Sequence, residues 1–150
     1  MNKIRLANVN DIAILAALDK TTSLTPWTMD NYTSSLYNSS HKIYILENSK
    51  QIIGALVLGI ALDEGEILQF WIKKEEQGKG YGLLLLRYGL DFFKKKLIVN
   101  IFLEVRFDNT NAIKLYHKLG FINAGIRKDY YKVDGWNFDA VIMLKNLQSY

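Results

Sequence analysis

Residues Glu66–Arg87 read EILQFWIKKEEQGKGYGLLLLR, and this segment sets the architecture of the whole chain. Its first seven residues, 66–72, have the apolar and aromatic content of a strand, and the polar run 73–76 predicts a turn. Glycines follow at every second position from 78 to 82, and a leucine run then begins a helix. The segment therefore predicts a strand, a glycine-rich loop and a helix in direct succession.

The glycine-rich loop is a candidate anion site. Glycine lets a backbone turn tightly and approach a ligand closely, and the free N–H groups at a helix N-terminus attract phosphate. A plain strand-to-helix turn is the alternative. The P-loop pattern GxxxxGK[ST] is absent, and the GxGxxG fingerprint would need a third glycine where Leu83 stands. ATP, GTP and NAD are therefore not the expected ligands.

The remaining pattern is Gln-x-x-Gly-x-Gly, formed by Gln77, Gly80 and Gly82. At these residues the chain resembles the GNAT superfamily of acyl-CoA-dependent N-acyltransferases. In that family the amides of this loop hold the pyrophosphate of coenzyme A. The resemblance implies acetyl-CoA as cosubstrate and contacts to it from Gly78, Lys79, Gly80, Tyr81, Gly82 and Leu83.

Length and composition indicate one ordinary globular domain over residues 1–150, with 49% hydrophobic residues and a mean hydropathy near zero. No apolar run approaches the roughly 20 residues of a membrane span, and the N-terminus lacks the apolar block of a signal peptide. A cytoplasmic protein without a membrane partner is expected. With no cysteines and two histidines, no disulfide, thiol nucleophile or metal site is expected.

The net charge of +4 is unevenly spread. Residues 73–132 hold 13 Lys/Arg against 6 Asp/Glu, whereas residues 1–72 hold 5 against 7. The basic part begins near the glycine loop, as a site for a multiply charged anion requires. Ordinary solvated lysines are the alternative, and no direct nucleic-acid binding is predicted because no aromatic interleaving or known motif accompanies the basic run.

Periodicity, capping residues and turns divide the rest of the chain into short elements without repeats or linkers. The expected strands are 3–7, 42–47, 51–62, 66–72, 97–106, 121–131 and 138–147. The expected helices are 10–19 capped by Asn10, 29–37 capped by Thr28, 80–96, and one capped by Asn109 or Asn111 that ends at Gly120. This order predicts an α/β (α+β) domain with one mixed, mostly antiparallel sheet of about seven strands and about four helices. It is also the order of the GNAT fold, in which the sheet splays in the middle.

Glu104 is the candidate general base. Strand alternation places it on one face with Phe102 and Arg106, while its apolar neighbours face the other way. A carboxylate in so apolar a strand is costly unless it is paired or functional. A salt bridge with Arg106, Arg87 or a lysine is the alternative. An amine nucleophile needs such a base, and an α-amine with pKa about 7.7–8.0 is neutralised more easily than a lysine near 10.4.

Tyr116 is the candidate general acid. A thiolate leaving group needs a proton or a hydrogen bond, and a tyrosine hydroxyl with pKa about 10 supplies either. Helical spacing places Tyr116 on one face with Ile113 and Gly120, so a purely structural role in the core is the alternative.

Several separate motifs in the right order are similar to the ribosomal-protein alanine N-acetyltransferase family. They are Pro26-Trp27-Thr28, Leu103-Glu104-Val105-Arg106, Asn109, Asn111-Ala112, Leu115-Tyr116, Leu119-Gly120-Phe121, Arg127 to Tyr131, Asp134-Gly135 and Asp139-Ala140. The resemblance implies that Glu104 is the general base, that Tyr116 is the general acid and that Asn109 contacts the pantetheine end of the cofactor. It also implies that the backbone of Phe70-Trp71-Ile72 binds the acetyl-pantetheine arm.

The same resemblance makes a protein N-terminus, that of a ribosomal protein, the expected acceptor. Pro26, Trp27, Tyr130 and Tyr131 are expected to wall the peptide groove, with packing under a long loop as the alternative. Trp71 departs from the family pattern, and its bulk is expected to narrow the acyl pocket or reshape the groove.

Two other functions stay open from the sequence. A small amine such as a polyamine or aminoglycoside is an alternative acceptor, and Asp63, Glu64 and Glu66 offer carboxylates for it. A non-enzymatic acyl-CoA-binding module is the second alternative, against which the retention of Glu104 and Tyr116 argues.

Overall fold

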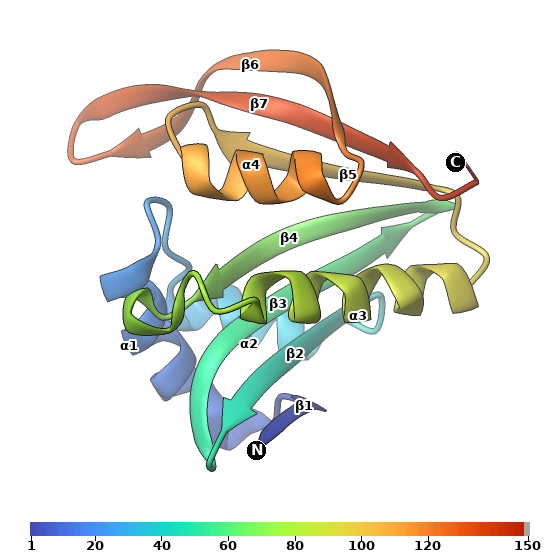
Figure 1. Cartoon of the computed structure of the whole chain (residues 1–150). Helices are drawn as coiled ribbons and strands as arrows, with labels where there is room; N and C mark the ends of the chain where they lie inside the picture. Colours follow the sequence, from blue (N-terminus) through green and yellow to red (C-terminus); the bar gives the residue numbers. More distant parts are fainter. Residues whose placement is uncertain (149–150) are drawn as a thin grey trace.

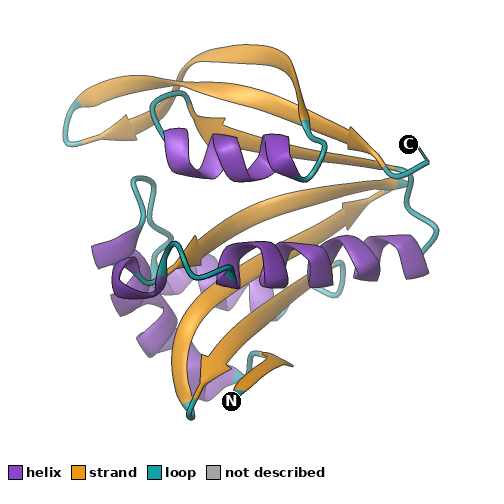
Figure 2. Ribbon diagram, in the orientation of Figure 1, coloured by secondary structure: helices purple, strands orange, loops and turns teal. Residues whose placement is uncertain are grey.

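The computed structural model describes residues 1–148 and contains one mixed seven-stranded sheet in the order β1-β2-β3-β4-β5-β7-β6, with helices on both faces (Figures 1 and 2). The β4–β5 pair is parallel and the other pairs are antiparallel. The strands are β1 (Asn2–Leu6), β2 (His41–Asn48), β3 (Gln51–Ala61), β4 (Glu64–Ile72), β5 (Asn100–Arg106), β6 (Ile122–Val133) and β7 (Trp136–Asn146). This confirms the predicted fold class.

The helices are α1 (Ile12–Thr22), α2 (Met29–Leu36), α3 (Tyr81–Lys95) and α4 (Thr110–Lys118). Thr28 caps α2 and Asn109, not Asn111, caps α4, each by accepting a hydrogen bond from a backbone N–H in the first turn. The predicted cap at Asn10 is wrong, because Asn8 caps a 3-10 turn, Val9–Asp11, that precedes α1.

The predicted start of β5 at Leu97 is also wrong. Leu97 has a positive φ of 61° and is exposed, and its N–H donates to the Lys94 carbonyl oxygen at the end of α3. A residue in this left-handed conformation ends a helix rather than beginning a strand. The strand therefore begins at Asn100, once the chain has left the helix.

The sheet splays between β4 and β5. These strands pair over four residues, from Glu64 opposite Asn100 to Ile67 opposite Leu103. Directly after Ile67, Leu68 is an extra residue in the β3–β4 ladder, and such a β-bulge bends a strand away from its neighbour. Figure 1 shows β4 and β5 together at one end and diverging toward the other.

Two apolar cores lie on opposite faces of the sheet. The larger core packs α3 and α4 against it and is centred on Leu56, Leu85, Phe93 and Leu103. The smaller core lies under α1 and α2. Both faces of β3 are thus covered, which explains its continuous apolar sequence.

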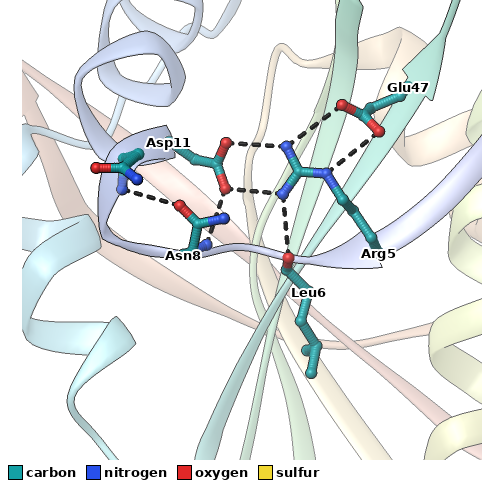
Figure 3. A network of polar contacts seen from close by, with 6 residues as sticks. Arg5, Leu6, Asn8, Asp11 and Glu47 are labelled. Carbon is teal, nitrogen blue, oxygen red and sulfur yellow. Dashed lines mark hydrogen bonds and ion pairs between the residues drawn. The ribbon is translucent and has the colours of Figure 1, made fainter. Parts of the chain in front are cut away.

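A polar network fastens β1 to its neighbours (Figure 3). The guanidinium of Arg5 donates to both carboxylate oxygens of Asp11, at 2.8 and 2.9 Å, and pairs with Glu47 on β2 at 3.2 Å. The N–H of Asn8 donates to the same Asp11 carboxylate at 2.8 Å. The N-terminal strand, the 3-10 turn and β2 are therefore held at one point.

Candidate active site

A groove of about 1400 Å³ lies where β4 and β5 part. It exceeds the 300–1,000 Å³ usual for a small-ligand pocket. The predicted site residues that line it are Pro26, Trp27, Phe70, Trp71, Ile72, Gly78, Gly80, Gly82, Leu83, Glu104, Asn109, Tyr116 and Tyr131. The splay thus brings together residues from five separate parts of the chain.

The glycine loop forms one end of the groove. Gly78 and Gly80 have positive φ values of 78° and 89°, which glycine adopts without strain. A Cβ built at either residue meets nothing within 4 Å, so the space beside the loop is open. Gly80 is the N-cap of α3 and has no side chain to satisfy the N–H groups of the first turn. The open space and the uncapped N–H groups of α3 therefore lie side by side at this loop.

Three predicted contact residues do not line the groove. Lys79 forms an ion pair with Glu76 at 3.1 Å, and the hydroxyl of Tyr81 accepts a hydrogen bond from Asn48. Tyr130 packs its ring edge-on against Tyr131. A role of Lys79 and Tyr81 in cofactor binding would depend on their backbone groups.

The end of β4 presents backbone groups to the gap. The N–H of Lys73 donates to Ile53 on β3 at 2.8 Å, and backbone groups alternate in direction along a strand, so those of Ile72 point away from β3. The side-chain amide of Gln77 donates a hydrogen bond to the Ile72 carbonyl oxygen. The Ile72 N–H is left facing the gap, where it can polarise a carbonyl.

The indole of Trp71 packs in the smaller core, under α1 and α2, where its Nε1–H donates to the Tyr32 hydroxyl at 2.9 Å. Phe70 and Ile72, its neighbours, contribute to the larger core on the other face. The bulk of Trp71 thus lies on the α1–α2 side and not on the face that carries α3 and α4.

Glu104 faces the groove from β5. Its Oε2 is buried and accepts no hydrogen bond from residues 1–148, although Arg127 Nε lies 3.4 Å away in an ion pair. The Tyr131 hydroxyl donates to the Glu104 backbone carbonyl oxygen at 3.1 Å. The alternative partner Arg106 pairs with Asp108 instead, at 2.7 Å. Oε2 of Glu104 therefore has a cationic neighbour, Arg127, but no hydrogen bond from residues 1–148.

Glu66 adds a second carboxyl group to this region. Its pKa is raised by burial and, next, by the negative charge of Glu104, while Arg127 acts in the opposite direction. Glu104, Glu66 and Arg127 thus form one electrostatic group at the point where β4 and β5 separate.

Tyr116 belongs both to the larger core and to the lining of the groove. It is buried, and its ring packs against Phe70 and Phe121 with centroids 6.2 and 5.8 Å apart. It also lines the groove, opposite the end of β4. Burial raises the pKa of its hydroxyl, and Tyr131 adds to the shift, so this group stays protonated at neutral pH.

The helix α4 supplies further polar lining. Asn109 uses its carbonyl oxygen to cap α4 through the Ala112 N–H, which leaves its amide N–H groups available to a ligand. Lys114 and Lys118 lie one turn apart on α4 and also line the groove. Their charges suit a phosphate-bearing ligand at this end.

The opposite mouth of the groove is lined by the α1–α2 segment and the β6–β7 hairpin. Pro26 and Trp27 come from the former and Tyr131 from the latter. Trp27 also packs edge-on against Tyr32, with centroids 5.3 Å apart. Trp27 therefore both lines the groove and packs against Tyr32.

Sequence reasoning missed Arg127 and Gln69. Arg127 lies in one of the family motifs, but its pairing with Glu104 depends on irregularities in β6 at residues 123–125 and 127–131 that no local pattern predicts. Gln69 lies beside the bulge and its side chain donates to Asp19 on α1. Gln69 is a polar residue inside an otherwise apolar strand, which was a signal, whereas Arg127 lies in a charged, exposed run that gave none.

No group of three or more His, Cys, Asp or Glu side chains that could hold a metal ion occurs within residues 1–148. In the same part of the chain, no helix is both long and apolar enough to cross a bilayer.

The sequence profile of the Acetyltransferase (GNAT) family matches residues 11–121. The ribosomal protein bS18-alanine N-acetyltransferase of Haemophilus influenzae is 34% identical over 134 residues, which cover 89% of this chain and 90% of that protein. The enzyme of the same name from Escherichia coli K12 is 29% identical over 143 residues, with 95% and 96% covered.

Among solved structures, the crystal structure of the ribosomal-protein-S18-alanine N-acetyltransferase from Escherichia coli superimposes with a TM-score of 0.89 at 26% identity. It covers 100% of this chain and 96% of that one. The likeness therefore extends over the whole sheet and all four helices.

Proposed function

Since the chain belongs to the GNAT family of acetyl-CoA-dependent N-acetyltransferases, we propose that it acetylates the N-terminal α-amine of a protein. The acceptor we infer is the N-terminal alanine of ribosomal protein bS18, the protein in the names of the relatives. A ribosomal acceptor implies a cytoplasmic enzyme.

One observation carries the proposal: the buried Oε2 of Glu104, which lacks a hydrogen-bond donor among residues 1–148 and faces the groove. Arg127, 3.4 Å away, offsets the charge of this oxygen but donates no hydrogen bond to it. An incoming amine would supply that donor. Glu104 is thus suited to take a proton from an α-amine, directly or through a water.

The groove residues fit acetyl-CoA. The open space beside Gly78 and Gly80 and the N-terminus of α3 suit its pyrophosphate, and Lys114 and Lys118 add positive charge. Acetyl-CoA supplies an activated acetyl thioester to the reaction.

The reaction is a direct transfer. The nitrogen of the neutral α-amine forms a bond with the acyl carbon, and Glu104 accepts the proton that this nitrogen then gives up. The Ile72 N–H stabilises the negative charge on the acyl oxygen, and one well-placed donor of this kind contributes roughly 3–4 kcal/mol. As the carbon–sulfur bond breaks, the hydroxyl of Tyr116 gives its proton to the departing thiolate.

The acceptor enters from the side opposite the glycine loop. Pro26, Trp27 and Tyr131 line that mouth, and Tyr130 packs against Tyr131, so the first residues of a peptide would lie between the α1–α2 segment and the β6–β7 hairpin. Aromatic walls suit a peptide backbone because they bury area with little loss of side-chain entropy.

The decisive experiment compares wild type, Glu104→Gln and Glu64→Gln with acetyl-CoA and a peptide that begins with alanine. Glu104→Gln is expected to lower kcat at least about 100-fold, because general base catalysis contributes 10²–10⁴-fold, with acetyl-CoA affinity nearly unchanged. Glu64 is exposed at the start of β4 and serves as the matched control. Unchanged turnover by Glu104→Gln would remove this residue from the chemistry.

The same assay tests the other functions. Faster turnover of spermidine than of the peptide would identify a small-amine acetyltransferase, and no transfer to any amine above background would indicate a binding module. Mass spectrometry of proteins from cells with and without the enzyme then identifies the acceptor as the N-terminus that loses an acetyl group.

A further inference from the structure

Asp19, at the end of α1, lies directly beneath the groove and is fully buried. Its carboxylate accepts hydrogen bonds from the Tyr32 hydroxyl, from the Trp27 backbone N–H at 3.2 Å and from the Gln69 amide at 3.0 and 3.2 Å. Asp19 itself does not line the groove. Asp19 therefore contacts residues that line the groove without lining it itself.

The donors to Asp19 come from different walls of the groove. Trp27 belongs to the α1–α2 segment that lines the proposed acceptor mouth, and Gln69 lies beside the bulge of β4. Gln69 also donates to the Thr25 carbonyl oxygen at 3.1 Å. The α1–α2 segment and β4 are thus joined both through Asp19 and directly.

Tyr32 extends these contacts to the end of β4. Its hydroxyl donates to Asp19 and accepts a 2.9 Å hydrogen bond from Nε1 of Trp71. Trp71 is the residue before Ile72, whose N–H faces the gap. Asp19, Trp27, Tyr32, Gln69 and Trp71, here called the Asp19 network, therefore reach both the acceptor mouth and the thioester position.

Burying an ionised carboxylate costs free energy unless other groups compensate its charge. Within residues 1–148, Asp19 has no Lys, Arg or His within ion-pair distance, so neutral donors alone compensate its charge. Burial raises its pKa accordingly. A leucine would pack at lower cost, but it could not accept the four hydrogen bonds that Asp19 receives from three residues.

We propose that Asp19 is a positioning residue that fixes the α1–α2 segment, residues 23–28, against the bulged part of β4 in the arrangement that acceptor binding requires. The proposal deepens the proposed function and rests on it. Asp19 touches neither substrate, so its loss should affect the acceptor side of the groove and spare the glycine loop, which it does not contact.

The test is steady-state kinetics of Asp19→Asn, which keeps the size of the side chain but replaces one acceptor oxygen with a donor. The peptide KM should rise about tenfold or more, while the KM for acetyl-CoA stays within about twofold, since one misplaced hydrogen bond pair costs on the order of a tenfold affinity change. Asp91→Asn, at an exposed carboxylate on α3, is the matched control.

Rescue separates positioning from a general loss of stability. The double variant Asp19→Asn/Gln69→Glu reverses donor and acceptor between these two side chains but gives up the Gln69 hydrogen bond to Thr25, so it should lower the peptide KM at least about threefold below that of Asp19→Asn without reaching the wild-type value. Tyr32→Phe keeps the ring contact with Trp27 but removes the hydroxyl from the Asp19 network. Tyr32→Phe should also raise the peptide KM, and it replaces Asp19→Asn in the test if that variant does not fold.

Hydrogen exchange of the free enzyme gives a readout that does not depend on the acceptor. Residues 23–28 should exchange faster in Asp19→Asn, or in Tyr32→Phe, while the helix α3 exchanges as in wild type. An unchanged peptide KM with unchanged exchange in this segment would overturn the positioning role. If wild type transfers nothing to peptides but the segment is selectively loosened, the positioning role stands and the proposed function fails.

Discussion

The side-chain amide of Gln77 donates a 2.8 Å hydrogen bond to the backbone carbonyl oxygen of Ile72. The residue that opens the glycine loop is therefore tied to the last residue of β4. This contact sets the distance between the two parts of the groove that we expect to hold the pyrophosphate and the thioester of the same acetyl-CoA molecule.

Gln77→Leu should weaken acetyl-CoA binding about 3–10-fold, because it removes a hydrogen bond worth about 0.5–1.5 kcal/mol from the loop anchor. Isothermal titration with acetyl-CoA measures the change. Gln51→Leu, at an exposed position at the start of β3, is the control and should bind normally. Equal affinity of the Gln77 variant and the control would show that the loop needs no anchor.

Gly80→Val should abolish or strongly weaken coenzyme binding, because the added side chain occupies the open space beside the loop and Gly80 has a positive φ. Gly135→Val is the matched control, since Gly135 has a φ of 80°, equally open surroundings and a place in the β6–β7 turn. Both variants carry similar backbone strain, so their melting temperatures should fall alike. Loss of coenzyme binding in both would assign the effect to strain.

Tyr116→Phe should lower kcat by about 10²-fold or more if the hydroxyl supplies the proton to the thiolate. The ring contacts with Phe70 and Phe121 remain, so thermal unfolding should change little. Tyr37→Phe, at an exposed residue after α2, controls for the loss of a hydroxyl. Wild-type turnover by Tyr116→Phe would leave this residue with a role in packing alone.

Asp11→Asn should destabilise the fold at neutral pH by about 1–3 kcal/mol, as expected for hydrogen bonds to a charged group. The pKa of Asp11 is lowered, mainly by its hydrogen bond with Arg5. Its contribution to the free energy of unfolding is thus present above the unfolded pKa of about 3.9 and is lost as the pH falls through the lower folded pKa.

Denaturant unfolding at several pH values should therefore show a gap between wild type and Asp11→Asn that closes in acid. Asp108→Asn breaks a similar bidentate pair with Arg106 at a more exposed site, and its effect should stay below about 1 kcal/mol. A pH-independent gap for Asp11→Asn would show that the Arg5 network in Figure 3 acts through packing.

Local patterns in the sequence were sufficient for the element order and for the two faces of β5. Alternation along β5 correctly placed Glu104 opposite its apolar neighbours, because side chains on a strand change face at every residue. The sequence left Asn109 and Asn111 as candidate caps of α4, and the structure shows that Asn109 is the cap. The misplaced start of β5 came from reading the apolar Leu97 as strand, although its backbone conformation ends a helix turn.

The contacts across the groove could not be predicted from the sequence, because they depend on irregular pairing in β4 and β6. The extra residue Leu68 turns Gln69 toward Asp19, 50 positions earlier in the chain. A one-residue shift of this kind reverses the face of every following side chain, so no periodic pattern can place them correctly across it. The resemblance to a family supplied the roles of Glu104 and Tyr116, while Arg127 and Asp19 emerged only from contacts.

The four residue pairs between β4 and β5 form a short seam, and the gap between the two strands widens from there toward the groove. Beyond it β4 continues unpaired with β5 for five residues, or about 16 Å at 3.3 Å per residue. A small rotation at the seam is thus magnified at the open mouth. Gly65 lies within these paired residues, where a Cβ would come within 2.7 Å of Phe93, so a larger residue at this position would have to displace Phe93 or the strand.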